Sequence, residues 1–215
     1  MPRKRLSQEE RRTQIIEVAM DLFARKGFKG ATTRAIAEAA GVSEAIIFRH
    51  FATKEDLYDA IIEHTIERRK NLWEQDESQV EAEGDLETLL RGFARAFVAR
   101  NRQDPTFIRL MMYSALEDHK FRERFLDMHR SPRIRAIREE IESGVQSGVY
   151  AQVDPRLTTI SFLWTLMQYS INRFVATTRP GDPEGDEEMI ENLIRVFTNG
   201  LRETAPPPGR PVSQK

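Results

Sequence analysis

The chain has 215 residues, no cysteine and a formal net charge of −1. The lack of cysteine excludes disulfide scaffolds, thiolate metal sites and cysteine nucleophiles. No run of about 18 apolar residues occurs, and the basic N-terminal residues do not lead into an apolar segment. We therefore expect a cytoplasmic protein with no membrane partner. The abundance of Ala, Leu, Ile, Glu and Arg predicts an all-α fold.

Charge is distributed unevenly along the chain. Residues 1–54 carry 11 Lys and Arg against 6 Asp and Glu, a net charge of +5, whereas the remaining residues carry 22 against 28, a net charge of −6. A basic N-terminal segment followed by an acidic remainder permits binding to a polyanion. Ordinary variation over a window of this length is the alternative interpretation.

The first predicted helix begins after Ser7, because Ser-Gln-Glu-Glu gives Ser7 and Glu10 the spacing of a capping box. Apolar residues then recur on one face as far as Phe23. Two cations and Gly27 follow, a sequence that is typical of the C-terminal end of a helix.

Residues 32–51 predict two short helices around a tight turn. Thr32 or Thr33 can cap the first helix, Gly41 can take the positive φ that the bend needs, and Ser43 can cap the second. Such a pair is either a helix-turn-helix or an ordinary αα-hairpin within a bundle.

The rest of the chain predicts a bundle of amphipathic helices, for about nine helices in total. Thr53 caps the first of these, and residues 75–85 form a polar loop. The Pro-rich residues 204–215 predict a disordered tail. The expected helices cover residues 53–73, 86–102, 105–117, 121–130, 132–147, 155–178 and 187–202.

Residues 32–54 read Thr-Thr-Arg-Ala-Ile-Ala-Glu-Ala-Ala-Gly-Val-Ser-Glu-Ala-Ile-Ile-Phe-Arg-His-Phe-Ala-Thr-Lys. This segment resembles the TetR family in its Thr-Thr opening, its Ala-Gly-Val-Ser turn, its aromatic-X-His-Phe ending, and in Lys54 and Leu57. The resemblance covers about Ser7 to Ile62, and beyond it the chain matches only as a helical bundle of the expected size. It implies a DNA-binding transcriptional regulator, by default a repressor.

We accordingly predict three parts. Residues 7–62 form a DNA-binding domain with its helix-turn-helix at 32–51, residues 63–203 form a ligand-sensing and dimerisation bundle, and residues 204–215 form the tail. Two recognition helices are needed to read a palindromic operator, so we expect a homodimer. The resemblance implies an interface formed by residues 155–178 and 187–202, and an ordinary monomeric core is the alternative.

The expected DNA contacts lie on the outward side of the two short helices, because Val42, Ile47 and Phe51 take the inward positions of the second. Helix amides near Thr33 favour a phosphate. Arg49 suits guanine and Glu44 suits cytosine. The expected DNA-binding residues are Thr32, Thr33, Arg34, Ser43, Glu44, Ala45, Ile46, Phe48, Arg49, His50 and Lys54.

Several of these assignments have alternatives. His50 is either a phosphate contact or a packing residue, and Glu44 is either a base contact or a solvated acid. Ile46 either meets a thymine methyl group or turns inward. Phe48 stands where the family usually has Tyr, so the phosphate contact of that hydroxyl group should be absent.

Aromatic and Met side chains spread over several helices of the bundle predict a cavity for a small, largely apolar ligand, with core packing as the alternative. A bundle that binds a protein partner is a second alternative, and an enzyme acting on a lipid-like substrate is a third. No catalytic constellation, metal site or cofactor is indicated, so we expect no enzyme. The expected pocket residues are Trp73, Phe93, Phe97, Phe107, Met111, Met112, Phe125, Met128, Trp164, Met167 and Gln168.

Overall fold

The computed structural model describes residues 6–77, 84–117, 131–176 and 183–202. Within these ranges the chain forms nine α-helices and one π-helical turn, with no strand beyond an isolated bridge between Tyr150 and Arg202. This confirms the predicted all-α fold class. No helix in the described ranges is long and apolar enough to cross a membrane.

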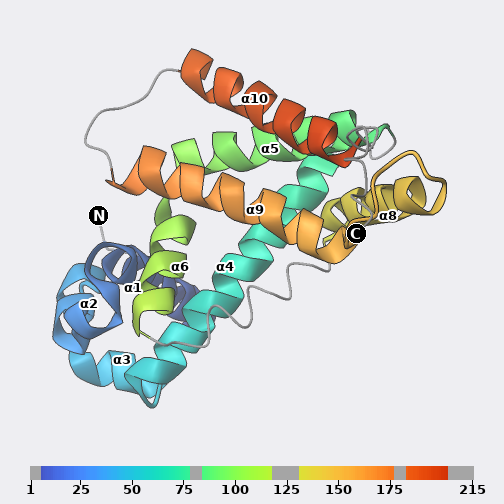
Figure 1. The fold of residues 1–215 in the computed structure, drawn as a ribbon. Coiled ribbons are helices and arrows are strands. Elements are labelled where there is room, and N and C mark those ends of the chain that lie inside the picture. Colours follow the sequence, from blue (N-terminus) through green and yellow to red (C-terminus); the bar gives the residue numbers. More distant parts are fainter. Residues whose placement is uncertain (1–5, 78–83, 118–130, 177–182, 203–215) are drawn as a thin grey trace, which may run out of the picture.

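The N-terminal part of the molecule consists of three helices and the beginning of a fourth (Figure 1). The fourth helix runs from this part into the remaining bundle, so one continuous rod connects the two. The bounds are α1 Gln8–Gly30, α2 Thr33–Ala40, α3 Glu44–His50 and α4 Lys54–Glu77.

Local capping explains where α1 and α4 begin. The Ser7 hydroxyl group accepts from the Glu10 N–H at 3.1 Å, and the Glu10 carboxylate accepts from the Ser7 N–H at 2.7 Å, which confirms the capping box. Thr53 and Asp56 make the same pair of bonds at the start of α4, at 3.0 and 2.9 Å. Each cap satisfies backbone donors that the helix itself leaves free.

Two helix ends differ from the expectation. Gly27 has φ 71°, as its sequence position indicated, but α1 continues past this kink to Gly30. The fourth helix reaches Glu77, beyond the expected end at residue 73. Gly27 itself is non-helical, so the expected end of the first helix appears as a kink between two helical segments. Residues 74–77 contain neither Gly nor Pro, so nothing there breaks α4.

The C-terminal bundle packs α5 against α8, α9 and α10, and α6 against both α9 and α1. The last helix begins at Pro183 rather than at Glu187, because proline is well suited to the first turn of a helix. Pro132 likewise occupies the first turn of α8, although Ser131 makes no side-chain cap. The bounds are α5 Leu86–Gln103, α6 Thr106–Glu117, α8 Pro132–Gln146, α9 Pro155–Ile171, η2 Asn172–Ala176 and α10 Pro183–Leu201.

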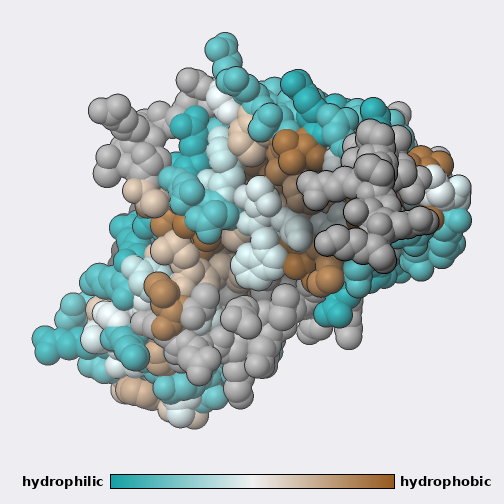
Figure 2. Space-filling model, in the orientation of Figure 1, coloured by the Kyte–Doolittle hydropathy of each residue, from teal (hydrophilic) through white to brown (hydrophobic). Residues whose placement is uncertain are grey.

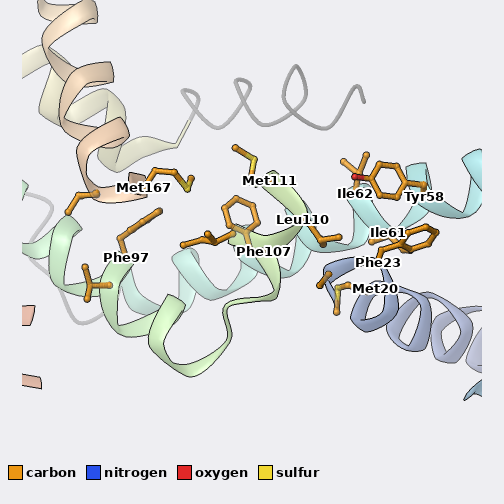
Figure 3. Packing of buried hydrophobic residues seen from close by; sticks show 14 of the residues in the cluster. Met20, Phe23, Tyr58, Ile61, Ile62, Phe97, Phe107, Leu110, Met111 and Met167 are labelled. Carbon is orange, nitrogen blue, oxygen red and sulfur yellow. The ribbon is translucent and has the colours of Figure 1, made fainter. Parts of the chain in front are cut away.

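A single buried cluster extends through both parts of the molecule. In Figure 3 it runs from Met167 and Phe97 past Leu110 of α6 to Ile61 and Met20. The division expected at residue 62 falls inside α4 and this cluster, and it stays a prediction. The expected helix 121–130 and the tail 204–215 lie outside the described residues.

Ion pairs between α5 and α10 close the bundle. The Arg91 guanidinium group donates to both carboxylate oxygens of Glu191, at 2.7 and 3.1 Å. Asp186, which is 3% exposed, accepts from Arg102, Arg173 and Tyr169. Burial opposes ionisation of this carboxyl group, but the three hydrogen bonds outweigh it and lower the pKa of Asp186.

Candidate DNA-binding site

The turn between α2 and α3 forms as its sequence indicates. The Thr32 hydroxyl group caps α2 by accepting from the Ala35 N–H at 3.1 Å. Gly41 ends α2 in the left-handed region at φ 67° and ψ 36°, where glycine carries no Cβ penalty. Ser43 takes the N-cap position of α3 but makes no side-chain hydrogen bond there, which corrects its expected capping role.

The inward side of α3 packs as predicted. Ile47 is 2% exposed and Phe51 is 3% exposed, and Val42 packs partly buried against the same cluster. The Arg12 guanidinium group of α1 lies 5.0 Å from the centre of the Phe51 ring, a cation–π contact between the two helices. These contacts hold α3 against α1 and leave its other side to solvent.

The outward side of α3 carries the side chains expected to meet DNA. Glu44, Ala45 and Arg49 are exposed, and Phe48 is 48% exposed. A seven-residue helix with an exposed, mostly polar side and a preceding helix at its back has the form of a recognition helix. Phe48 therefore presents an apolar ring to the surface, with no hydroxyl group to donate.

His50 and Ile46 lie at the edge of this exposed side, and both are half-buried. Ile46 packs against the core cluster with part of its side chain. The choice between packing and DNA contact therefore stays open for each of them, because a half-buried side chain offers some surface to both.

Three of the expected DNA-contact residues form bonds within the chain. The Thr33 hydroxyl group donates to the Glu44 carboxylate at 3.0 Å, which joins the first turns of α2 and α3. Arg34 pairs with Glu38 one turn along α2 at 3.1 Å, with both side chains well exposed. Exposed interactions of this kind are weak. The Arg34 guanidinium group and the Thr33 hydroxyl group can therefore each exchange its carboxylate partner for a phosphate.

Lys54 has a different environment from the one expected. Its ammonium group donates to the Phe28 carbonyl oxygen at 2.5 Å and lies 4.3 Å from the centre of the Phe28 ring. It also lies 5.7 Å from the centre of the Phe23 ring. The side chain is half-buried and joins the start of α4 to the end of α1, so it has a structural contact beside the expected phosphate contact, which stays a prediction.

Sequence reasoning missed a part of this surface. Ser7, Gln8 and Arg11 of α1 line a groove whose other wall is formed by α3 residues, among them Arg49. The basic character of the N-terminal segment was the only signal for it, because neither periodicity nor the turn motif places α1 beside the outward side of α3.

The expected ligand-pocket residues divide into two groups. Phe93, Phe97, Phe107, Met111 and Met167 are buried, and Met112 is half-buried. Trp164 is 51% exposed and Gln168 is exposed, so both face away from the interior and are corrected. They share the solvent side of α9, where Gln168 bonds Asn172. The Trp73 side chain, Phe125 and Met128 lie outside the described residues.

Comparison with known proteins agrees with this geometry. The family described as "Bacterial regulatory proteins, tetR family" matches residues 15–61. The transcriptional repressor AcnR of Corynebacterium efficiens is 30% identical over 185 residues, which are 86% of this chain and 92% of AcnR. The likeness therefore extends well beyond the helix-turn-helix.

Solved structures share the fold. A TetR family regulator from Chloroflexus aurantiacus superposes with a TM-score of 0.71 at 19% identity, over 91% of this chain and 95% of that one. FadR from Bacillus subtilis, in complex with stearoyl-CoA, has a TM-score of 0.66 at 18% identity, over 88% of this chain and 99% of that one. The chain belongs to the TetR family of bacterial regulatory proteins, which are DNA-binding transcription regulators.

Proposed function

We propose that the chain is a homodimeric repressor that reads a palindromic operator and leaves it when a small, largely apolar ligand binds in the C-terminal bundle. The exposed outward side of α3 carries the DNA-binding part of this proposal. The similarity to the repressor AcnR, which covers most of the length of both chains, supports repression rather than activation. The parts are those expected from sequence, with residues 7–62 binding DNA and 63–203 sensing and dimerising.

The reading of DNA divides among the exposed side chains. In this proposal Arg49 donates two hydrogen bonds to guanine, and Thr33 with the α2 amides binds a phosphate. Glu44 can accept from cytosine once it releases the Thr33 hydroxyl group. Phe48 can meet a thymine methyl group, which gives this operator an apolar contact in place of a tyrosine hydroxyl.

Dimerisation is supported by the apolar surface of α9 and α10. Leu157 is 60% exposed and Trp164 is 51% exposed on α9, and Val196 is 60% exposed on α10. Figure 2 shows hydrophobic side chains gathered on this side of the bundle, next to the hydrophilic surface of α10. An apolar surface of this kind on the helix pair expected to dimerise favours contact with a second copy.

Ligand response is supported by the continuity between the bundle and α1. Phe107, Met111 and Met167 lie together in Figure 3, and Leu110 continues the row toward Met20. The Tyr113 hydroxyl group of α6 also donates to the Arg25 carbonyl oxygen of α1 at 3.2 Å. A ligand that moves α6 would therefore move α1 and the recognition helix packed on it.

The test uses the 215-residue chain and an operator selected from a random duplex pool. We expect the wild type to sediment as a dimer, and the Trp164→Glu variant to be a monomer whose operator affinity is about 10³-fold weaker, near the nonspecific level. Val149→Glu, at a 62% exposed position between α8 and α9, is the matched control and should behave as wild type. A Trp164→Glu dimer with full affinity would contradict the proposed interface.

A second measurement tests ligand response. Stearoyl-CoA, the molecule bound by FadR, is the first probe to titrate into the protein–operator complex. An effective ligand should weaken operator binding about 5- to 150-fold, the range of ordinary allosteric couplings. Ligand binding with unchanged operator affinity would show that the bundle binds the ligand without regulating DNA binding.

A further inference from the structure

A groove of about 520 Å³ separates the beginning of α1 from the outer edge of α3. One wall belongs to the first turn of α1 and the two residues before it, the floor belongs to the turn between α2 and α3, and the other wall belongs to α3. The lining residues are Leu6, Ser7, Gln8, Arg11, Gly41, Val42, Ile46, Arg49 and His50.

The chemistry of the lining suits a polyanion. Arg11, Arg49 and His50 supply basic groups, Ser7 and Gln8 supply neutral donors, and none of the nine lining residues is acidic. The Arg11 guanidinium group donates to the Gln14 side chain at 2.6 Å, which holds it in a fixed position on α1. The nearby Glu10 carboxylate is bonded to the Ser7 N–H and does not line the groove.

The position of the groove identifies its occupant. Arg49 belongs both to the outward side of α3 and to the groove wall, and His50 lies at the edge between them, so a duplex read by α3 brings one of its strands past this edge. Contacts to phosphate and sugar fix the register of a protein on DNA, and guanidinium, hydroxyl and amide groups make most of them. In the sequence, the cations Arg3, Lys4 and Arg5 precede Leu6.

We propose that this groove holds the sugar-phosphate backbone of one DNA strand, at the edge of the major groove that α3 enters, with Arg11 as a phosphate contact. The proposal rests on the proposed DNA-binding function and adds α1 to the DNA-binding surface. Because the capping box already uses the Ser7 and Glu10 amides, the contacts fall to side chains rather than to free helix amides.

The test compares Arg11→Ala with wild type on the selected operator and on a random duplex, by fluorescence anisotropy over a range of salt concentrations. We expect about tenfold weaker binding to both duplexes, the effect of losing a hydrogen bond to a charged group. The plot of log affinity against log salt should become less steep by about 0.9 for each phosphate that the variant no longer neutralises. Circular dichroism verifies that the variant is folded.

Operators with single neutral methylphosphonate linkages then locate the contact. At one linkage beside the α3 site, neutralisation should weaken wild-type binding but leave Arg11→Ala binding unchanged. Arg11→Lys keeps the charge and should retain most of the affinity. Arg25→Ala, which removes an exposed cation near the other end of α1, should bind as wild type.

The outcomes separate this inference from the proposed function. A wild type that binds no duplex would refute the DNA-binding proposal itself. A wild type that binds, with Arg11→Ala equal to it in affinity and salt dependence, would overturn the groove contact and leave the function intact. Loss of operator binding alone, with an unchanged salt slope, would also overturn it, because that pattern belongs to a base contact.

Discussion

The molecule has an N-terminal head, formed by α1 to α3 with the start of α4, and a C-terminal body, formed by α5 to α10. The two differ in how far apart in sequence their interacting residues lie. In the head, the capping pairs join residues three apart, and Gly41 sets the turn by its own conformation. In the body, Arg91 bonds Glu191 across 100 residues, and Arg102 bonds Asp186 across 84. Local caps therefore set helix ends in the head, whereas the ion pairs that close the body join partners distant in sequence.

This difference teaches which part of the protein can be inferred from residue types alone. A recognition helix needs a fixed angle to its neighbour, and a short turn with caps specifies that angle locally. A bundle that takes up a ligand needs helices that can shift, and side-chain pairs between helices allow alternative arrangements. Three substitution pairs test this contrast, from the largest expected effect to the smallest.

The largest effects should come from the two aromatic cores. Phe23 in the head is fully buried, stacks on Phe28 with ring centres 5.7 Å apart, and meets the edge of Tyr58 at 5.2 Å. Phe93 in the body is 2% exposed. We expect Phe23→Ala and Phe93→Ala each to lower the free energy of unfolding by about 3 to 5 kcal/mol. Denaturant unfolding followed by circular dichroism measures this.

Because one buried cluster spans head and body, both variants should shift a single cooperative transition. Two transitions, each shifted by only one of the variants, would show instead that the head and the body unfold independently. That outcome would support the domain division at residue 62 and weaken the coupling route through α6.

The next effect concerns the buried carboxylate of the body. Asp186→Asn removes the negative charge to which Arg102 and Arg173 donate, and we expect it to lower the free energy of unfolding by about 3 kcal/mol near neutral pH. Asp21→Asn breaks an exposed pair with Arg25 in the head and should cost less than about 0.5 kcal/mol. Equal effects of the two substitutions would remove the distinction between local and long-range ion pairs.

The effect of Asp186→Asn on stability should depend on pH in a definite direction. Folding lowers the pKa of Asp186 from its ordinary value of 3.8, so its carboxylate stabilises the fold above that pH. This contribution is lost as the pH falls from 3.8 through the lower pKa of the folded state. The difference in stability between wild type and Asp186→Asn should therefore shrink below pH 3.8. A difference that is constant down to pH 2 would contradict the ion-pair explanation.

The smallest effect compares two glycines that both have open space around an added Cβ. Gly41 in the head has φ +67°, whereas Gly200 lies in α10. Gly41→Ala should destabilise the protein by about 1 to 2 kcal/mol because alanine is strained at this φ. Gly200→Ala should stabilise it by about 0.5 to 1 kcal/mol through helix propensity. Thermal unfolding measures both, and a neutral Gly41→Ala would show that the turn tolerates another conformation.

The residues that the sequence located correctly are those whose role depends on near neighbours. The Ser7 and Thr32 caps, the left-handed Gly41 and the buried Ile47 were all confirmed. Ser43 was wrong as a side-chain cap, since its backbone takes the cap position without the expected bond. Composition, helical periodicity and turn chemistry thus determined the all-α class and the outline of the DNA-reading unit, because each acts over a few residues of chain.

Other features appear only when distant segments meet. Lys54 belongs to a family-like motif, but its ammonium group bonds Phe28, which lies 26 residues earlier. Trp164 was expected in the pocket because its side chain is aromatic, but the packing of α9 turns it outward. The environment of Asp186 has no sequence signature, and the α1–α3 groove has only the basic character of the N-terminal segment. Periodicity shows that a helix has a buried side, but the identity of its partner, and the direction of each remaining side chain, depend on how all the helices fill the space between them.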